Sequence, residues 1–521
     1  MINKYWLIVK KWVQNNKKEA FLIVVILLIG SLLRLYKIGG YMTFLGDEGR
    51  DVIIVRRLLV DFDLILIGPR TSIGDMYLGP LYYYMMAPAL LLSAFSPVGP
   101  AVMIAILGIV TIFFVWYVTR HWFPEEKALN KAALVAAGLY AISPVVIEYS
   151  RSSWNPNIMP FFALFTIFSI WKWWYERKSK WLIATGISMA FALQSHYLGL
   201  LLIPVIAFFW ILTLLKRNSS HRAKFFRYSL IAGLLVAILM SPLVIFDARH
   251  GWRNFSSMSK FFSERQTTVS ARPWSAFPKV GGIFQQIVTR LVAGKHVEIG
   301  KYMTLVFEVG LIALTLSFLR NKFRSKESNA FLLLIVWLGV AIIGLGVYKQ
   351  HIYDHYYGFF YPAPFILVGV LVQKAFLKLG ADGKIFATAV VAFIVVANLL
   401  SNPLRFAPNF QVQRSIDAAR LIQQESNGEK YNLAVIADRN YEDGYQYFLE
   451  KWNEPVYDID PLRLDETIAE QLFVVCELEK ELCDPVHSPK AEIANFGWSV
   501  IENQWDISWV TVFKLVHSKD N

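Results

Sequence analysis

Charged residues are scarce in this sequence: only 17% of its 521 residues are Asp, Glu, Lys or Arg, whereas 55% are hydrophobic. Soluble domains carry about 25% charged residues. The composition therefore excludes an ordinary soluble protein and predicts a protein that lies in a membrane. The 17 Trp, 24 Tyr and 38 Phe residues agree with this prediction, because aromatic rings favour the membrane–water interface.

Cysteine is nearly absent too, since Cys476 and Cys483 are the only two. Two cysteines are too few for a cysteine-ligated metal site. They form a disulfide or remain two independent thiols, and their spacing in the sequence does not decide between these alternatives. The sequence also lacks an HExxH motif, an internal repeat and a low-complexity linker.

The basic residues that give the chain its net charge of +13 are not gathered in one patch. Residues 401–521 hold 11 Lys and Arg against 21 Asp and Glu, a net charge of −10, and residues 1–400 hold 41 against 18, a net charge of +23. Within the first 400 residues the basic side chains cluster in short segments between apolar runs. This is the pattern of cytoplasmic loops rather than of a nucleic-acid groove, so we expect no nucleic-acid partner.

Apolar runs of the roughly 17 to 25 residues that span a bilayer recur along the first 400 residues. The run 181–215 is too long for one helix and is interrupted by Gln194, Ser195 and His196, which predicts two short helices joined by a tight turn. The first run follows a lysine-rich segment and precedes no small-residue cleavage site, which predicts an uncleaved anchor. The sequence thus predicts about eleven transmembrane helices: this pair and nine others near 20–38, 98–119, 131–147, 157–174, 227–245, 302–319, 330–348, 356–376 and 384–400.

The segment Pro80–Phe95 decides on which side of the membrane every later loop lies. It is apolar but only 16 residues long, contains Pro88 and begins with three tyrosines. If it does not span, the N-terminus and five later basic segments, which together hold 24 Lys and Arg, all face the cytoplasm, as the positive-inside rule requires. We therefore predict an interfacial helix at 80–95, a cytoplasmic N-terminus and an extracytoplasmic C-terminus in a multi-pass protein of the plasma membrane.

The predicted organisation is a transmembrane domain at 1–400 and an extracytoplasmic α/β domain at 401–521. A helical pattern at 415–424 precedes strand-like segments at 431–437, 471–478 and 508–516, with a second helix between the first two strands. The first outer loop, at 39–97, opens with adjacent carboxylates, Asp47 and Glu48. Apolar residues at helical spacing follow them, with arginines on the other faces, which predicts an amphipathic helix lying on the bilayer.

Two interpretations of the carboxylates stay open at this point. Asp47 caps the helix and the arginines hold lipid phosphates, or the carboxylate and a neighbouring arginine perform chemistry. A carboxylate can accept a proton and a neighbouring guanidinium can stabilise negative charge, and Asp47 beside Arg50 supplies both groups.

The chain resembles GT-C glycosyltransferases of the protein mannosyltransferase type (family 39) and the related aminoarabinose transferases. The resemblance rests on Asp47-Glu48 and Arg50 after the first membrane helix, on GPLYY at 79–83 opening an interfacial helix, and on the segments 143–162, 192–204 and 355–367. It covers roughly residues 20–400. A basic residue that often precedes the Pro-Leu-Tyr stretch is absent here, where Leu78 and Gly79 stand.

The resemblance implies an inverting transferase in which Asp47 is the base on the acceptor hydroxyl and Glu48 orients the base or the acceptor. Arg50, Arg70 and Arg151 are candidates for the donor phosphate, since a guanidinium holds two phosphate oxygens at once. Glu148 resembles the second acidic position of the family; snorkelling or pairing with Arg151 is its alternative role. The remaining expected substrate-binding residues are Tyr82, Tyr83, Asn155, His196, Tyr197, Asp247, His250, His351, His355 and Tyr356.

The expected partners are a polyprenyl-phosphate sugar donor and a lipid, protein or polysaccharide acceptor. The histidines lack the spacing of a structural metal site, and a divalent ion bridging Asp47 and the donor phosphate is the one open cofactor role. The alternatives are an oligosaccharide transferase or polymerase that uses lipid-linked glycans, and a secondary transporter. A transporter would be expected to show charged residues at the bilayer midplane and inverted repeats, which the sequence lacks.

Overall fold

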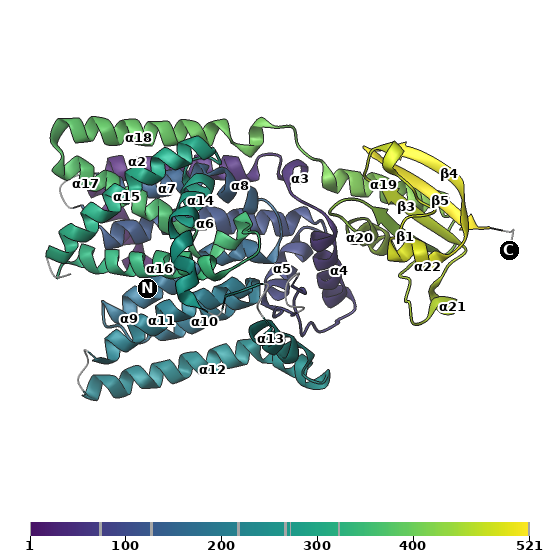
Figure 1. Cartoon of the computed structure of the whole chain (residues 1–521), viewed down its shortest axis with the longest axis horizontal. Coiled ribbons are helices and arrows are strands. Elements are labelled where there is room, and N and C mark those ends of the chain that lie inside the picture. Colours follow the sequence, from purple (N-terminus) through teal and green to yellow (C-terminus); the bar gives the residue numbers. More distant parts are fainter. Residues whose placement is uncertain are drawn as a thin grey trace.

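The computed structural model describes residues 2–71, 76–125, 129–215, 219–264, 268–270, 272–320 and 324–518. Its larger part is a bundle of long helices, and a smaller α/β part lies at one end of this bundle (Figure 1). The main apolar helices of the bundle are α2 (Lys17–Leu35), α6 (Val98–Trp122), α7 (Lys131–Ile142), α9 (Met159–Trp174), α10 (Trp181–Ser195), α11 (Leu202–Leu215), α12 (Ser219–Arg249), α15 (Val297–Arg320), α16 (Lys326–Val347), α17 (Pro362–Lys378) and α18 (Gly380–Leu400).

The predicted polytopic helical membrane protein is confirmed. Among the described residues, six helices are long and apolar enough to cross a membrane, or seven if the bent pair η6 (Asp354–Phe360) and α17 is one span. The number eleven stays a prediction, because several apolar helices are short. The predicted break in 181–215 is present: α10 ends at Ser195, His196 is extended, and the short helix η2 (Tyr197–Leu201) leads into α11.

Helix α5 (Leu81–Leu92) occupies the segment that decides the predicted topology. It has 12 residues, which at about 1.5 Å per residue gives about 18 Å, well short of the roughly 30 Å of a bilayer core. This length supports an interfacial helix rather than a span. It begins directly after Pro80, whose fixed φ suits a helix start.

The α/β part contains a five-stranded sheet in the order β2-β1-β3-β5-β4. Strands β1 (Tyr431–Ile436), β2 (Val456–Tyr457) and β3 (Gln471–Cys476) are parallel, and β5 (Val510–His517) and β4 (Ser499–Ile507) join antiparallel. Every residue of β1 and β3 is buried, as continuous apolar runs in parallel strands predict. Strand β4 was not predicted, since most of its residues are polar and exposed. Cys476 and Cys483 are joined by a disulfide.

Helix α4 (Gly46–Val60) packs against both parts, and its surroundings correct one expectation. Its apolar residues Val52, Ile53 and Val55 are buried in a core shared with α5 and with α20 (Asp443–Lys451) of the α/β part. The helix therefore does not lie with its apolar face on the bilayer. The sequence pattern predicted an apolar contact, but a protein surface rather than lipid provides it, and Figure 1 shows α4 beside α20 at the junction.

The remaining short helices are α1 (Ile2–Asn15), α3 (Ile38–Tyr41), α8 (Pro144–Tyr149), η1 (Asn155–Ile158), α13 (Arg253–Ser263), η4 (Pro273–Lys279), α14 (Val280–Ile287), η5 (Val288–Val292), η7 (Pro403–Arg405), α19 (Gln411–Glu425), α21 (Leu464–Thr467), η8 (Lys480–Leu482) and α22 (Ala491–Phe496). Of these, η1, together with the short helix η6, carries residues of the candidate site described below.

Candidate active site at the junction

A cavity of about 450 Å³ lies where helix α4 meets the loops of the helical bundle. We call it the Asp47 cavity, after the carboxylate in its wall. Seven residues expected from the sequence line it together: Asp47, Arg50, Arg70, Asn155, His196, His355 and Tyr356. They come from five separate segments of the chain, so the fold brings together residues that the sequence spreads over more than 300 positions.

Asp47 is held at the N-terminal end of α4 by two partners. Nη1 of Arg50 lies 2.8 Å from Oδ1 of Asp47, and the hydroxyl of Tyr441 donates a short hydrogen bond to the same oxygen. The side chain remains 44% exposed, so the carboxylate is fixed and still reachable from the cavity. The Arg50 contact follows from the i, i+3 spacing on a helix. The Tyr441 contact comes from the α/β part, and no residue pattern near Asp47 in the sequence predicts it.

Arg50 is itself held by a second carboxylate that the sequence did not single out. Nε and Nη2 of Arg50 donate to Oδ1 of Asp51 at 3.2 and 2.8 Å, and the Tyr83 hydroxyl donates to the same oxygen at 2.9 Å. Burial raises the pKa of Asp51 even with Arg50 beside it. Oδ2 of Asp51 is buried with no hydrogen-bond partner among the described residues. The arrangement fixes the guanidinium so that it presents Nη1 to Asp47.

Glu48 has a structural position in the helix start. Its Oε2 accepts a hydrogen bond from the backbone N–H of Leu45 at 3.0 Å, which is the return half of a capping box. Burial raises the pKa of Glu48 to about 7. The side chain is buried at the junction and does not belong to the wall of the Asp47 cavity.

Glycines allow α20 to approach the helix start that carries Asp47. A Cβ atom at Gly46 would lie 2.3 Å from the ring of Tyr441, and one at Gly49 would lie 2.3 Å from the backbone nitrogen of Gly444. Both distances are impossible for real side chains. The sequence GDEG therefore combines Asp47 with a surface flat enough for the α/β part to reach it.

Aromatic rings close the other side of the Asp47 cavity. His355 lies with its ring centroid 4.7 Å from that of Trp154, 5.7 Å from His196 and 4.6 Å from Tyr356. Nδ1 of His196 accepts from the backbone N–H of Leu198 at 3.1 Å, which fixes its orientation. Trp154 is also part of the cavity wall.

Several expected site residues lie elsewhere and have structural partners. Arg151 donates to the carbonyl oxygens of Leu33 and Tyr36 at 2.6 and 2.7 Å, at the end of α2. Tyr82 is buried against Ser153, and Tyr83 contacts Asp51. The other three are absent from the cavity lining: the Tyr197 hydroxyl donates to the carbonyl of Tyr77, Asp247 accepts from the backbone N–H groups of Asn254 and Phe255, and His250 stacks on Phe246.

Glu148 and His351 line a second cavity, of about 590 Å³, which we call the Glu148 cavity. Glu148 pairs with Lys295 at 2.7 Å. The alternative partner expected from the sequence, Arg151, is occupied by backbone carbonyls instead. No group of three or more His, Cys, Asp or Glu among the described residues is placed to hold a metal ion.

Known proteins resemble this chain in part of its sequence and in most of its fold. Residues 78–246, roughly a third of the chain, match the family model described as dolichyl-phosphate-mannose-protein mannosyltransferase. ArnT from Cupriavidus metallidurans, solved with undecaprenyl phosphate, superimposes with a TM-score of 0.58 at 14% identity, covering 96% of this chain and 98% of that one. The chain has the GT-C fold.

Two further structures extend the GT-C likeness. The archaeal oligosaccharyltransferase AglB from Archaeoglobus fulgidus, solved with an inhibitory peptide and a dolichol-phosphate, gives a TM-score of 0.56 at 14% identity over 89% of this chain and 70% of that one. The arabinofuranosyltransferase AftD from Mycobacteria gives 0.51 at 11% identity over 97% of this chain and 42% of that one. No curated protein matches the sequence. At these identities the structures establish the GT-C fold and leave the chemistry to the site.

Proposed function

We propose that this protein is a membrane glycosyltransferase that moves a sugar from a polyprenyl-phosphate donor to an acceptor hydroxyl at the outer face of the membrane. The observation that carries the proposal is the Asp47 cavity. Among the described residues in its wall, Asp47 is the one carboxylate, and Arg50 and Arg70 are the cations. The proposal agrees with the family model matched by residues 78–246 and with the GT-C structures solved with dolichol-phosphate and undecaprenyl phosphate.

The reaction that suits this geometry is a single inverting displacement. The acceptor oxygen forms a bond to the anomeric carbon, and the bond from that carbon to the phosphate oxygen breaks. Asp47 takes the acceptor proton, and the leaving phosphate keeps the bonding electron pair. Arg50 and Arg70 stabilise the negative charge that grows on the phosphate. Because Arg50 already donates to Asp47 and Asp51, it also holds the base in place.

Outer-face placement rests on loop charge and on two structural observations. Helix α5 is too short to span, which keeps the later basic loops on the cytoplasmic side. Cys476 and Cys483 form a disulfide, a bond that persists in oxidising compartments outside the cytosol. We therefore infer a catalytic transmembrane domain at 1–400 and an extracytoplasmic α/β domain at 401–521, which meet at Asp47.

The test is transfer by the purified protein in lipid nanodiscs. Radiolabelled polyprenyl-phosphate sugars are supplied singly, with extracted envelope lipids, glycans and peptides as acceptors, and polyprenyl-diphosphate oligosaccharides are included because the AglB likeness raises an oligosaccharide transferase as the second candidate. We expect transfer by the wild type and by Asp61→Asn, an exposed carboxylate just after the end of α4, and none above background by Asp47→Asn. Undiminished transfer by Asp47→Asn would falsify the base assignment.

A further inference from the structure

The Glu148 cavity lies behind the aromatic wall of the Asp47 cavity. Its walls come from α8, the end of α14, η5 and residues 350–357. Its volume of about 590 Å³ lies within the roughly 300 to 1,000 Å³ of small-molecule sites. Gln286, Gln350, His351 and Tyr353 are exposed, so the cavity is open to the surface.

The charges in this cavity neutralise one another. Nε of Arg290 donates to Oδ1 of Asp354 at 2.6 Å, and Nη2 of Arg290 pairs with Oδ2 of the same carboxylate. Lys295 pairs with Glu148 at 2.7 Å and lies 4.0 Å from Asp354. Two cations and two carboxylates therefore cancel among the described lining residues. These four side chains therefore offer an entering phosphate no net positive charge, which disfavours an anionic ligand.

The uncharged part of the lining matches a carbohydrate. The amides of Gln286 and Gln350 and the imidazole of His351 offer both donors and acceptors, which suits hydroxyl groups that do the same. The rings of Tyr149 and Tyr353 supply apolar faces against which the C–H face of a sugar ring packs. The ion pairs fix carboxylate oxygens that can accept hydrogen bonds, and they add no net charge.

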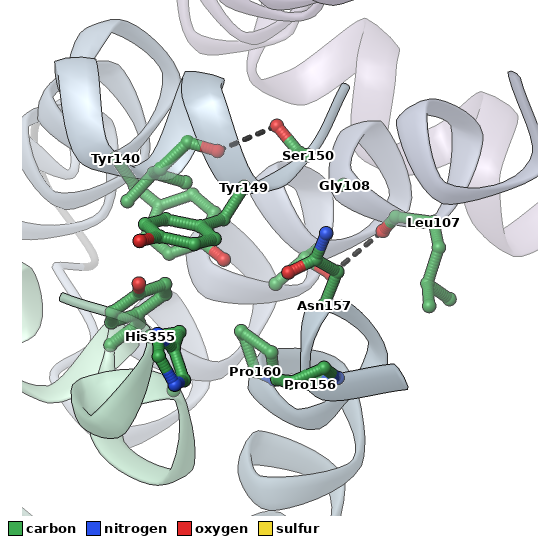
Figure 2. A pocket seen from close by; sticks show the side chains of 13 residues that line it. Leu107, Gly108, Tyr140, Tyr149, Ser150, Pro156, Asn157, Pro160 and His355 are labelled. Atoms are coloured by element: carbon green, nitrogen blue, oxygen red, sulfur yellow. Dashed lines mark hydrogen bonds between the residues drawn. The ribbon is translucent and has the colours of Figure 1, made fainter. Parts of the chain in front are cut away.

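The two cavities share one wall, and His355 is at its centre. On the Asp47 side, His355 contacts Trp154 and Tyr356; on the Glu148 side, its ring centroid lies 6.0 Å from that of Tyr149 and 5.8 Å from that of Tyr353. Tyr149 and His355 also line a small pocket of about 20 Å³ together with Pro156 and Pro160, as Figure 2 shows. The two cavities thus lie on either side of one cluster of aromatic rings, and successive units of a saccharide chain around this cluster could reach both.

We propose that the Glu148 cavity binds an uncharged saccharide, as the part of a glycan acceptor that lies beyond the hydroxyl under attack in the Asp47 cavity. The assignment of the saccharide to the acceptor rests on the proposed transferase function. The binding of the saccharide does not, because it depends only on the lining of this cavity.

Two measurements keep these claims separate. Donor hydrolysis, in which water replaces the acceptor, reports on the Asp47 cavity alone, and saccharide binding reports on the Glu148 cavity alone. A wild type that binds saccharide but never consumes donor would contradict the transferase and leave the binding site standing. A wild type that consumes donor but binds no saccharide would contradict the saccharide site and leave the transferase proposal standing.

The binding experiment uses the full chain in nanodiscs, with saturation-transfer NMR and titration of mannohexaose, cellohexaose and maltohexaose, each also carrying a terminal phosphate. We expect one neutral hexasaccharide to bind, and binding to weaken about tenfold in the double variant Gln286→Ala/His351→Ala, the size expected for one or two lost hydrogen bonds. Gln285→Ala, a neighbouring glutamine outside the cavity wall, and Asp47→Asn are expected to bind like the wild type. Absence of binding by all three saccharides, equal binding by the double variant, loss in Asp47→Asn alone, or tighter binding of the phosphorylated forms would each overturn the proposal.

Discussion

The two cavities are of similar size and share a wall, yet they treat charge in opposite ways. The described lining of the Asp47 cavity holds two arginines against one aspartate, with the buried Asp51 behind Arg50. That of the Glu148 cavity holds two cations and two carboxylates that pair with one another. This difference in lining charge supports the proposal of phosphate chemistry in the first cavity and of saccharide recognition in the second, and each prediction below tests that division.

Asp47→Asn is the change that we expect to separate the cavities most strongly. Asparagine keeps the shape of the side chain but cannot accept the acceptor proton, so transfer should fall by about 10² to 10⁴-fold. Saccharide binding in the Glu148 cavity should stay at the wild-type level. Transfer rates and binding isotherms on the same preparation check both expectations. A parallel loss of transfer and of saccharide binding would mean that the two cavities act as one site.

Removal of Arg50 from the Asp47 cavity should destabilise the folded protein far more than removal of Arg290 from the Glu148 cavity. Arg50→Gln leaves the fully buried Asp51 without its cation, at a cost of about 3 to 5 kcal/mol. Arg290→Gln breaks a pair in which the arginine is 39% exposed, so solvent screening limits the cost to about 1 kcal/mol or less. Thermal unfolding of both variants in nanodiscs gives the comparison. Equal shifts in Tm would show that burial does not distinguish the pairs.

Tyr441→Phe removes the hydrogen bond through which the α/β part reaches the Asp47 cavity. Loss of this hydrogen bond leaves the Asp47 carboxylate less firmly oriented, so transfer should fall about three- to tenfold. The kcat and KM of transfer are the measurement, and Tyr457→Phe, an exposed tyrosine of the same sheet, is the control. Transfer by Tyr441→Phe equal to that of the wild type would show that Tyr441 does not position the carboxylate.

The last prediction concerns pH, and it belongs to the Asp47 side alone. Burial raises the pKa of Glu48 from 4.5 to about 7, and burial together with Glu442 raises the pKa of Asp443 from 3.8 to about 7. Since the folded protein keeps these protons and the unfolded chain loses them near pH 4, their stabilisation is complete below pH 4 and is lost as the pH rises through about 7. Tm measured between pH 4 and 8 should fall, and Glu48→Gln should flatten the fall. A Tm that rises over this range would contradict the assignment.

Much of the fold could be predicted because membrane and strand periodicities are local. The break at His196, the short helix after Pro80 and the buried strands β1 and β3 all followed from apolar runs and the residues that interrupt them. Strand β4 was missed because its polar residues face solvent and its pairing with β5 is a non-local property.

The candidate site could be predicted only in part. Residues on one helix turn, such as Asp47 and Arg50, are neighbours by spacing alone. Glu148 lies next to Lys295, 147 positions away, and Tyr441 reaches Asp47 across 394 positions. Nothing in a single sequence reports such distances.

The sequence by itself determined that Asp47 begins a helix directly after a membrane helix, with an arginine one turn later and glycines on either side. Tertiary structure decided what those features serve. The glycines leave room for α20 to pack closely, Tyr441 fixes the Asp47 carboxylate, and the buried Asp51 orients Arg50. Local spacing is set by the geometry of the backbone, whereas the partners of a charge are set by the packing of distant elements, which is why Asp47 could be singled out in the sequence and the residues that position it could not.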